Sequence, residues 1–167
     1  MATAEQKLAA ALGEYVIGSI DIQMGESSRV HTTPIERLFM LALLGMVQCQ
    51  VIPFELKLGL DPSRDHTALS FSPQHDIDGW LVDYLFEVVS NDGKRRMRLI
   101  VECDGHDYHE RTKEQAKRDR ARDRMLQEKG YTIYRFTGSE LFNGAFECAT
   151  QVVRWAENAV WIKGEGF

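Results

Sequence analysis

The segment 99–109, Leu-Ile-Val-Glu-Cys-Asp-Gly-His-Asp-Tyr-His, carries the residues of this chain that are best suited to chemistry. An apolar, strand-like run leads directly to Glu102 and Asp104, and Gly105 then breaks the pattern. Alternate side chains of a strand share one face, so we expect the two carboxylates on the same side, with Cys103 facing the core. Two acids at a strand end favour the binding of a hard cation, and a phosphate can accompany it.

A third acid is expected to join them through a β-hairpin. The run 80–89 is rich in aromatic and β-branched residues, and Asp92-Gly93 after it is a strong signal for a two-residue turn. Counting outward from that turn sets Asp83 opposite Glu102, at a Cβ separation of roughly 4.5–5.5 Å. A looser loop starting at Ser90 would shift this register.

Three carboxylates in one corner need a compensating charge. Two like charges about 4 Å apart repel by roughly 4 kcal/mol even at an effective dielectric near 20. Either one acid is protonated or a cation lies between them. Carboxylates with few soft ligands favour Mg²⁺, Mn²⁺ or Ca²⁺ over zinc. The alternative interpretation is that Asp83 and Asp104 only cap strand ends in solvent.

The order of these residues resembles a known family. Asp83, a hairpin and then Glu102-Cys103-Asp104-Gly105 are similar to the Asp…(Asp/Glu)-x-Lys motif of the restriction-endonuclease-like PD-(D/E)xK nucleases. The segment Asp104–His109 is also similar to the His-Gly-x-x-Trp-His segment of very short patch repair endonucleases, and small bacterial proteins related to that enzyme look most similar. The resemblance runs from about Thr33 to Leu141.

The resemblance implies a metal-dependent endonuclease that hydrolyses phosphodiester bonds in repair, restriction or a mobile element, with DNA favoured over RNA. It implies that Asp83 and Glu102 hold Mg²⁺ or Mn²⁺, helped by the backbone carbonyl of Cys103 and by Asp104. The metal would polarise the phosphate and lower the pKa of bound water.

Two further residues acquire candidate roles from the same resemblance. His109 matches the family's histidine and is the candidate general acid or base. Glu36, on the first core helix, matches a glutamate that approaches the metal. Glu36 has a second explanation, because Thr33-Pro34-Ile35-Glu36 is a capping box with proline at the first helical position.

One departure from the family concerns its lysine. Asp104 stands in that position, so no lysine follows two residues after Glu102. Its role, to orient water or to neutralise developing charge, is expected to pass to His109, Lys113 or Lys117. If none of them reaches the site, the chain is an inactive nuclease fold that binds nucleic acid or a protein partner, and this is the alternative function.

Basic residues are concentrated locally, although the formal net charge of the chain is −5. The segment 110–124 has seven basic residues against four acidic ones. Local basic surface decides phosphate binding more than net charge does. The alternative is a solvated helix with ion pairs such as Glu114 with Arg118. The expected nucleic-acid contacts are Lys94, Arg95, Arg96, Lys113, Lys117 and Arg118.

Composition is that of an ordinary globular protein, with 167 residues, 44% apolar and 27% charged. No stretch approaches the roughly 20 apolar residues of a membrane span, and the N-terminus lacks a signal-peptide pattern. Three widely spaced cysteines, Cys49, Cys103 and Cys148, fit a reduced protein better than a disulfide framework. We therefore expect a cytoplasmic protein with no membrane partner, and a homodimer or an accessory protein stays open.

The expected architecture is α/β: a restriction-endonuclease-like core with a mixed central sheet and a β-hairpin, flanked by helices. We expect one domain over 1–167, with a helical extension at 1–32, the core at 33–141 and a C-terminal helix at 142–167. The segment 49–66 contains prolines and a glycine and stays unassigned. The expected elements are a helix over 3–20, a helix from Pro34 to about Gln48, a strand Thr67–Ser72, a turn at Asp78-Gly79, the hairpin, a helix from about Glu110 to Lys129 closed by Gly130, a strand Tyr131–Phe136 and a helix from about Ala145 to Ile162.

Overall fold

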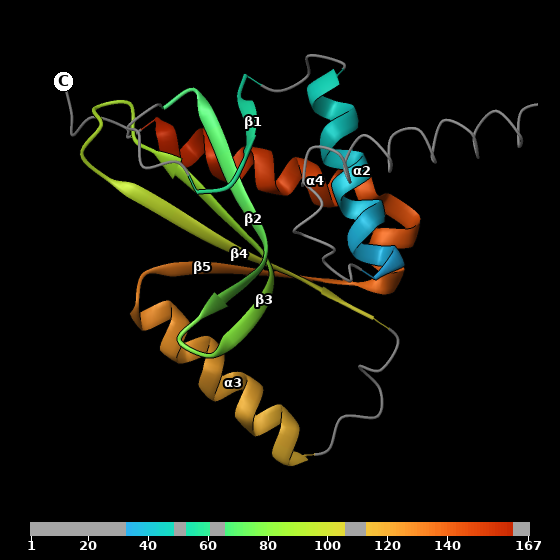
Figure 1. Cartoon of the computed structure of the whole chain (residues 1–167). Coiled ribbons are helices and arrows are strands. Elements are labelled where there is room, and N and C mark those ends of the chain that lie inside the picture. Colours follow the sequence, from blue (N-terminus) through green and yellow to red (C-terminus); the bar gives the residue numbers. More distant parts are fainter. Residues whose placement is uncertain (1–32, 49–52, 61–65, 106–112, 162–167) are drawn as a thin grey trace, which may run out of the picture.

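The computed structural model describes residues 33–48, 53–60, 66–105 and 113–161. The expected helix over 3–20, and also His106 and His109, lie outside these residues. The described elements (Figure 1) are, in chain order, α2 (Pro34–Gln48), β1 (Glu55–Leu58), β2 (Ala68–Ile77), β3 (Trp80–Val89), β4 (Arg96–Asp104), α3 (Lys113–Glu128), β5 (Tyr131–Thr137) and α4 (Gly138–Val160).

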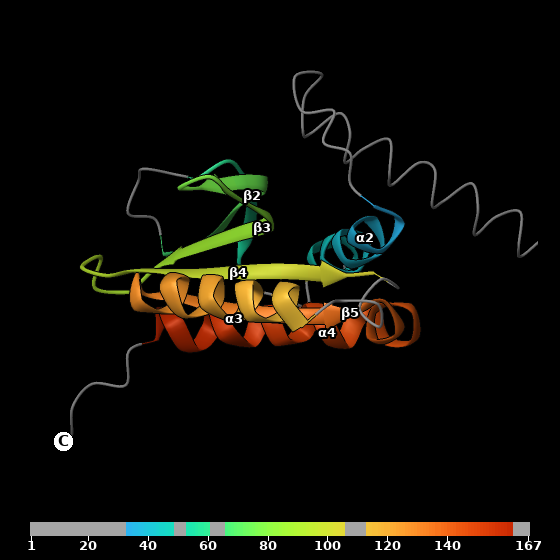
Figure 2. The same ribbon diagram turned by 90° about the horizontal axis from the view of Figure 1, so that it is seen from below.

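The five described strands form one mixed sheet in the order β1-β2-β3-β4-β5. The β1–β2 and β4–β5 pairs are parallel, whereas β2–β3 and β3–β4 are antiparallel. Helices α2 and α4 lie on one side of β4 and β5, and α3 lies on the other (Figure 1). Strands β2 and β3 twist away from the plane of β4 (Figure 2). The expected α/β architecture with a mixed sheet and flanking helices is confirmed.

Helix α2 has the bounds that the sequence predicts, because the signals at its start are local. The hydroxyl of Thr33 accepts the backbone N–H of Glu36 at 3.4 Å, and the Thr33 carbonyl accepts that of Arg37 at 3.1 Å. One turn later, the fully buried ring of Phe39 lies 5.7 Å from Tyr84 and 5.9 Å from Phe136, between ring centroids. These aromatic contacts fix the start of α2 over the sheet.

The β3–β4 register is the one that counting from Asp92-Gly93 predicts. Tyr84 pairs with Val101, and Val89 pairs with Arg96. Each pair has the same sum of residue numbers as the predicted pair of Asp83 with Glu102. The acidic residues of the two strands are therefore brought to one end of the sheet.

The prediction of a two-residue turn at Asp92-Gly93 is wrong. The backbone N–H of Gly93 donates to the Ser90 carbonyl at 2.8 Å, and the N–H of Ser90 donates to the Arg95 carbonyl at 2.9 Å. The N–H of Asn91 donates instead to Val160 at the end of α4, at 3.0 Å. A wider loop thus starts at Ser90, and it leaves the register unchanged because it takes equal numbers of residues from both strands.

The β2–β3 turn at Asp78-Gly79 is confirmed. Both residues have positive φ, 53° and 84°, and Ile77 pairs with Trp80 across the turn. This is the two-residue geometry that favours Asp-Gly in hairpins. The turn brings Trp80 to the beginning of β3, three residues before Asp83.

Three element boundaries differ from the sequence-based expectation. Strand β2 continues to Ile77 rather than ending at Ser72. Its second half is polar and mostly only partly buried, so it lacks the apolar alternation by which a strand is predicted. The unassigned segment contains β1, a short strand with partly exposed side chains. Helix α4 starts at Gly138, where Thr137 and Glu140 form a capping box, and a kink at Gly144 separates this N-terminal part from the expected helix.

Helix α3 ends as predicted and covers the second face of the sheet. Gly130 follows it with φ 87°, the left-handed conformation expected after a helix. Leu126 is fully buried and packs in a small cluster with Ile100 of β4 and Ile133 of β5. The N-terminal half of the helix is mostly exposed. Within the described part of the chain, no helix is long and apolar enough to cross a membrane.

Candidate active site

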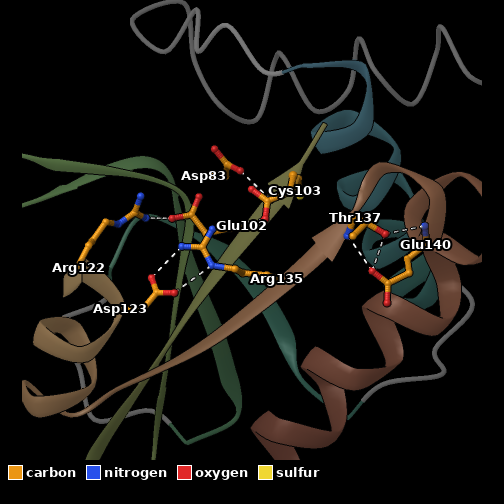
Figure 3. Close-up of polar contacts among 9 residues, drawn as sticks. Asp83, Glu102, Cys103, Arg122, Asp123, Arg135, Thr137 and Glu140 are labelled. Atoms are coloured by element: carbon orange, nitrogen blue, oxygen red, sulfur yellow. Dashed lines mark hydrogen bonds and ion pairs between the residues drawn. The ribbon is translucent and has the colours of Figure 1, made fainter. Parts of the chain in front are cut away.

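The acidic site is built around the end of β4, where Asp83 of β3 reaches the neighbouring strand. Asp83 Oδ2 accepts the backbone N–H of Cys103 at 2.7 Å (Figure 3). This bond holds the Asp83 carboxylate against the peptide that joins Glu102 to Cys103. The register prediction and the observed contact agree in placing these two acidic positions side by side.

Glu102 and Asp104 point to the α3 side of the sheet, and Cys103 points to the opposite side, as strand alternation predicts. The buried Glu102 carboxylate contacts the guanidinium of Arg122 from α3 (Figure 3). Cys103 is buried in the main core with Phe136. Burial raises the pKa of the Cys103 thiol, and the charge of Asp83 adds to this, so the protonated thiol is favoured.

A second arginine holds Asp104. Arg135 Nη1 lies 3.4 Å from Asp104 Oδ2, and the same guanidinium donates to both carboxylate oxygens of Asp123, at 2.8 Å and 3.2 Å. Asp123 belongs to α3, so this network ties β4, β5 and α3 together, and Figure 3 shows its Arg135–Asp123 pair. A bidentate guanidinium–carboxylate pair of this kind is both strong and geometrically specific.

Glu36 reaches the site from α2. Its buried carboxylate accepts the Gln74 side-chain amide of β2 at 3.0 Å and the Thr33 hydroxyl at 2.8 Å. Burial raises the pKa of Glu36, and the charge of Asp83 adds to the increase. Both interpretations of Glu36 therefore apply, because it lies at the helix cap and within electrostatic reach of Asp83.

Among the described residues, the site has more carboxylates than arginines. Burial raises the pKa of Asp83, and Asp104 raises it further, while the Cys103 N–H and the Arg122 guanidinium lower it. Counting Glu36, Asp83, Glu102, Asp104 and Asp123, the carboxylates outnumber the two arginines beside them. Such an imbalance favours either a bound proton or a bound cation.

The donor set fits a hard divalent cation by its chemistry. Carboxylate oxygens of Asp83 and Glu102 and the backbone carbonyl of Cys103 are the oxygen ligands that Mg²⁺ prefers. Glu102 Oε1 is a buried oxygen whose contact among the described residues is the ion pair with Arg122 Nη2. In the described ranges no three side chains of His, Cys, Asp or Glu form a metal-holding group, and Glu102 is paired with Arg122.

The other predicted site residues, which are basic side chains and His109, lie on different parts of the chain. Lys117 and Arg118 are exposed on α3, where Lys113 is the first residue, and His109 lies outside the described residues. Lys94, Arg95 and Arg96 lie at the opposite end of β4, about 25 Å from the acids along the strand. Arg96 Nη1 is 2.5 Å from the buried carboxylate of Glu87, which gives it a structural partner. The structure does not bring this basic group to the acidic corner.

Arg122 and Arg135 are the site residues that the sequence reasoning missed. A helical signal was available, since Arg122 precedes the buried Leu126 by one turn and residues four apart share a helix face. Arg135 likewise shares its strand face with Ile133, which packs against α3. Arg122 was counted within the basic segment 110–124, and Arg135 was given no role in the predicted strand Tyr131–Phe136, although burial is what places both at the acids.

The fold and the site together define a restriction-endonuclease-like domain. The family model described as REase_MTES_1575, a restriction-endonuclease-like family, matches residues 65–154, more than half of the chain. The chain belongs to this family, which indicates a nuclease. No curated protein and no solved structure gave a match. The particular similarity to very short patch repair enzymes stays a prediction.

We expect Asp83→Asn to raise the melting temperature of the cation-free protein at pH 7.5. Burial raises the pKa of Asp83, so its charged form opposes folding above that pKa, and asparagine keeps the acceptor for the Cys103 N–H. As the pH falls through the raised pKa, Asp83 takes up a proton in the folded state and the advantage of asparagine disappears. The difference in free energy of unfolding between Asp83→Asn and the wild type changes by at most about 1.4 kcal/mol per pH unit.

Calorimetry of both proteins between pH 4.5 and 7.5 in EDTA measures this difference. Asp92→Asn is the control with the opposite sign, because hydrogen bonds from Ser90 and Lys94 lower the pKa of the exposed Asp92. A melting temperature of Asp83→Asn below that of the wild type at pH 7.5 would contradict the assigned electrostatics.

Proposed function

We propose that this chain is a metal-dependent endonuclease that hydrolyses phosphodiester bonds in DNA, with Mg²⁺ or Mn²⁺ as cofactor. One observation carries the proposal: Asp83 lies against the end of β4 in a restriction-endonuclease-like fold. The Cys103 N–H donates a hydrogen bond to Asp83 and fixes this contact. The buried thiols of Cys103 and Cys148 are free, which suits the reducing cytoplasm.

In this proposal, Asp83, Glu102 and the Cys103 carbonyl hold the metal. When bound, the metal supplies a Lewis acid for the phosphate and lowers the pKa of its water towards neutrality. The Cys103 N–H orients Asp83, and Arg135 orients Asp104. His109 is the proposed general acid or base, and Glu36 completes the negative field beside Asp83.

The alternative function is an inactive nuclease fold that binds nucleic acid or a protein partner. Two observations favour it: Asp104 stands where the family has lysine, and Arg122 already pairs with Glu102. The excess of carboxylates argues for the enzyme, because a binding module gains nothing from negative charge placed where phosphates would lie.

A cleavage screen separates the two functions. Supercoiled plasmid, labelled duplex DNA and labelled RNA of the same sequence are incubated with the full chain in Mg²⁺, Mn²⁺ or EDTA. We expect cation-dependent nicking of the plasmid, faster on DNA than on RNA. Binding of duplex DNA without cleavage in either cation would support the inactive module instead.

We expect Lys117→Ala with Arg118→Ala to weaken DNA binding at all sequences alike. Both side chains are exposed on α3, the helix that also carries Arg122 to the acids. Each lost phosphate contact lowers the slope of log affinity against log salt by about 0.9, so the double variant should lose up to about two units. Titrations in Ca²⁺ between 50 and 200 mM salt measure the slope. Arg154→Ala on α4 is the matched control, and an equal slope in all three proteins would remove this helix from the interface.

A further inference from the structure

Arg122 is a mostly buried arginine whose charged partner is Glu102. Its side chain is 14% exposed, and its Nη2 forms an ion pair with Oε1 of the buried Glu102. Nε of the guanidinium is buried without a hydrogen-bond partner in the part of the chain that the structure describes. Arg135, by contrast, donates to both oxygens of Asp123. A buried donor without an acceptor is unfavourable, so this N–H group of Arg122 stays available for a ligand.

Arg122 lies next to Glu102, one of the two expected metal ligands, and contacts its carboxylate directly. Lys117, by contrast, is exposed on an earlier turn of the same helix. Arg122 therefore brings a cation to the acids from α3, whereas the family motif brings one from the strand position that Asp104 occupies here.

Trp80 also contacts the Arg122 guanidinium. The centre of the Arg122 guanidinium lies 5.8 Å from the centroid of the Trp80 ring, a cation–π contact. Trp80 comes from the start of β3, three residues before Asp83, and is partly exposed. The contact orients the arginine and also provides a fluorescent reporter of its position.

We propose that the positively charged Arg122 side chain binds phosphate at this site and takes over the role of the absent motif lysine. The proposal rests on the nuclease function proposed above. A divalent cation on Glu102 would compete with the Arg122 guanidinium for the same carboxylate and would free the guanidinium from its partner. The planar fork of N–H donors then matches the phosphate oxygens and offsets the charge that develops on them.

The first test measures cation binding without any reaction. Titration calorimetry with Ca²⁺ compares the wild type with Arg122→Gln, with Arg154→Gln on α4 as the control. Because Arg122→Gln removes a competitor for Glu102, we expect its Ca²⁺ affinity to rise about tenfold, as expected for the loss of about 1.4 kcal/mol of competition. Unchanged or weaker Ca²⁺ binding would overturn the competition.

The fluorescence of Trp80 tests the same step by position. Ca²⁺ should change the tryptophan emission of the wild type, and this change should be absent in Trp80→Phe and in Arg122→Gln. An identical change in wild type and Trp80→Phe would place the signal elsewhere and would count against movement of Arg122. Thermal unfolding of each variant confirms that the comparison is between folded proteins.

The second test measures the role of Arg122 towards phosphate. Single-turnover cleavage of plasmid in Mg²⁺ should fall about 10²–10³-fold in Arg122→Gln, with partial recovery in Arg122→Lys, because the charge returns without the fork. If the wild type cleaves and Arg122→Gln cleaves at the same rate, the role of Arg122 is overturned and the nuclease function is not. If the wild type neither binds Ca²⁺ nor cleaves DNA, the nuclease function is overturned, and this proposal with it.

Discussion

Glu102→Gln is expected to abolish cleavage and to leave the fold intact. The substitution keeps the size of a buried side chain and removes only its charge, while the neighbouring core residues, Val101 and Cys103, face the other side of the sheet. A metal ligand supplies several kcal/mol of transition-state stabilisation, so the rate should fall by about 10³-fold or more. DNA affinity should stay similar or rise, because one negative charge is lost beside the phosphates.

Single-turnover cleavage in Mg²⁺ and DNA binding in Ca²⁺ measure the two effects separately. Glu128→Gln, an exposed acid at the end of α3, is the matched control and should cleave at the rate of the wild type. Arg122 loses its charged partner in Glu102→Gln, so the melting temperature must be recorded as well. Cleavage by a folded Glu102→Gln protein at the wild-type rate would exclude Glu102 as a metal ligand.

Phe39→Ala is expected to have the largest effect on stability. The ring is fully buried and contacts Tyr84, Phe86 and Phe136, so its removal opens a cavity between α2 and the sheet. Substitutions of this kind cost about 3–5 kcal/mol. Because Glu36 lies one turn earlier on α2, the same change should also loosen the contact of Glu36 with the site.

Urea unfolding of the full chain measures the free energy of unfolding. Phe142→Ala on α4 is the control, because that ring is 80% exposed and its loss should change the free energy by less than about 0.5 kcal/mol. Equal effects of the two substitutions would mean that α2 is not anchored to the sheet through Phe39.

The predictable parts of the fold are those whose signals are local. Thr33 and Pro34 define the start of α2, and Asp78-Gly79 defines a two-residue turn with positive φ. The β3–β4 register followed from counting and survived a wider loop than expected. In each case, neighbouring residues determine the backbone conformation without reference to the rest of the chain.

The parts that escaped prediction depend on contacts between distant segments. Phe54, Leu56 and Leu58 alternate with polar residues, but the flanking Pro53 and Gly59 obscure the signal of β1, which forms only by parallel pairing with β2. The loop at Ser90 widens because Asn91 bonds to the end of α4. Neither pairing can be read from the local pattern.

The candidate site shows the same division. Asp83, Glu102 and Asp104 could be brought together from strand periodicity and the hairpin register alone. Arg122 and Arg135 come from α3 and β5, and only the packing of Leu126 on Ile100 and Ile133 brings these elements to the acids. A charged helix in the sequence has no sign that distinguishes its one buried guanidinium from its exposed neighbours, except spacing from a buried leucine.

Crystals of the full chain soaked in Mn²⁺, with data collected at the manganese absorption edge, test directly whether the acidic corner is a metal centre. We predict an anomalous peak in contact with the carboxylates of Asp83 and Glu102 and the Cys103 carbonyl, with the Arg122 guanidinium displaced from Glu102. If no peak appears at this corner at saturating Mn²⁺ and Arg122 is still paired to Glu102, the nuclease function as proposed is contradicted.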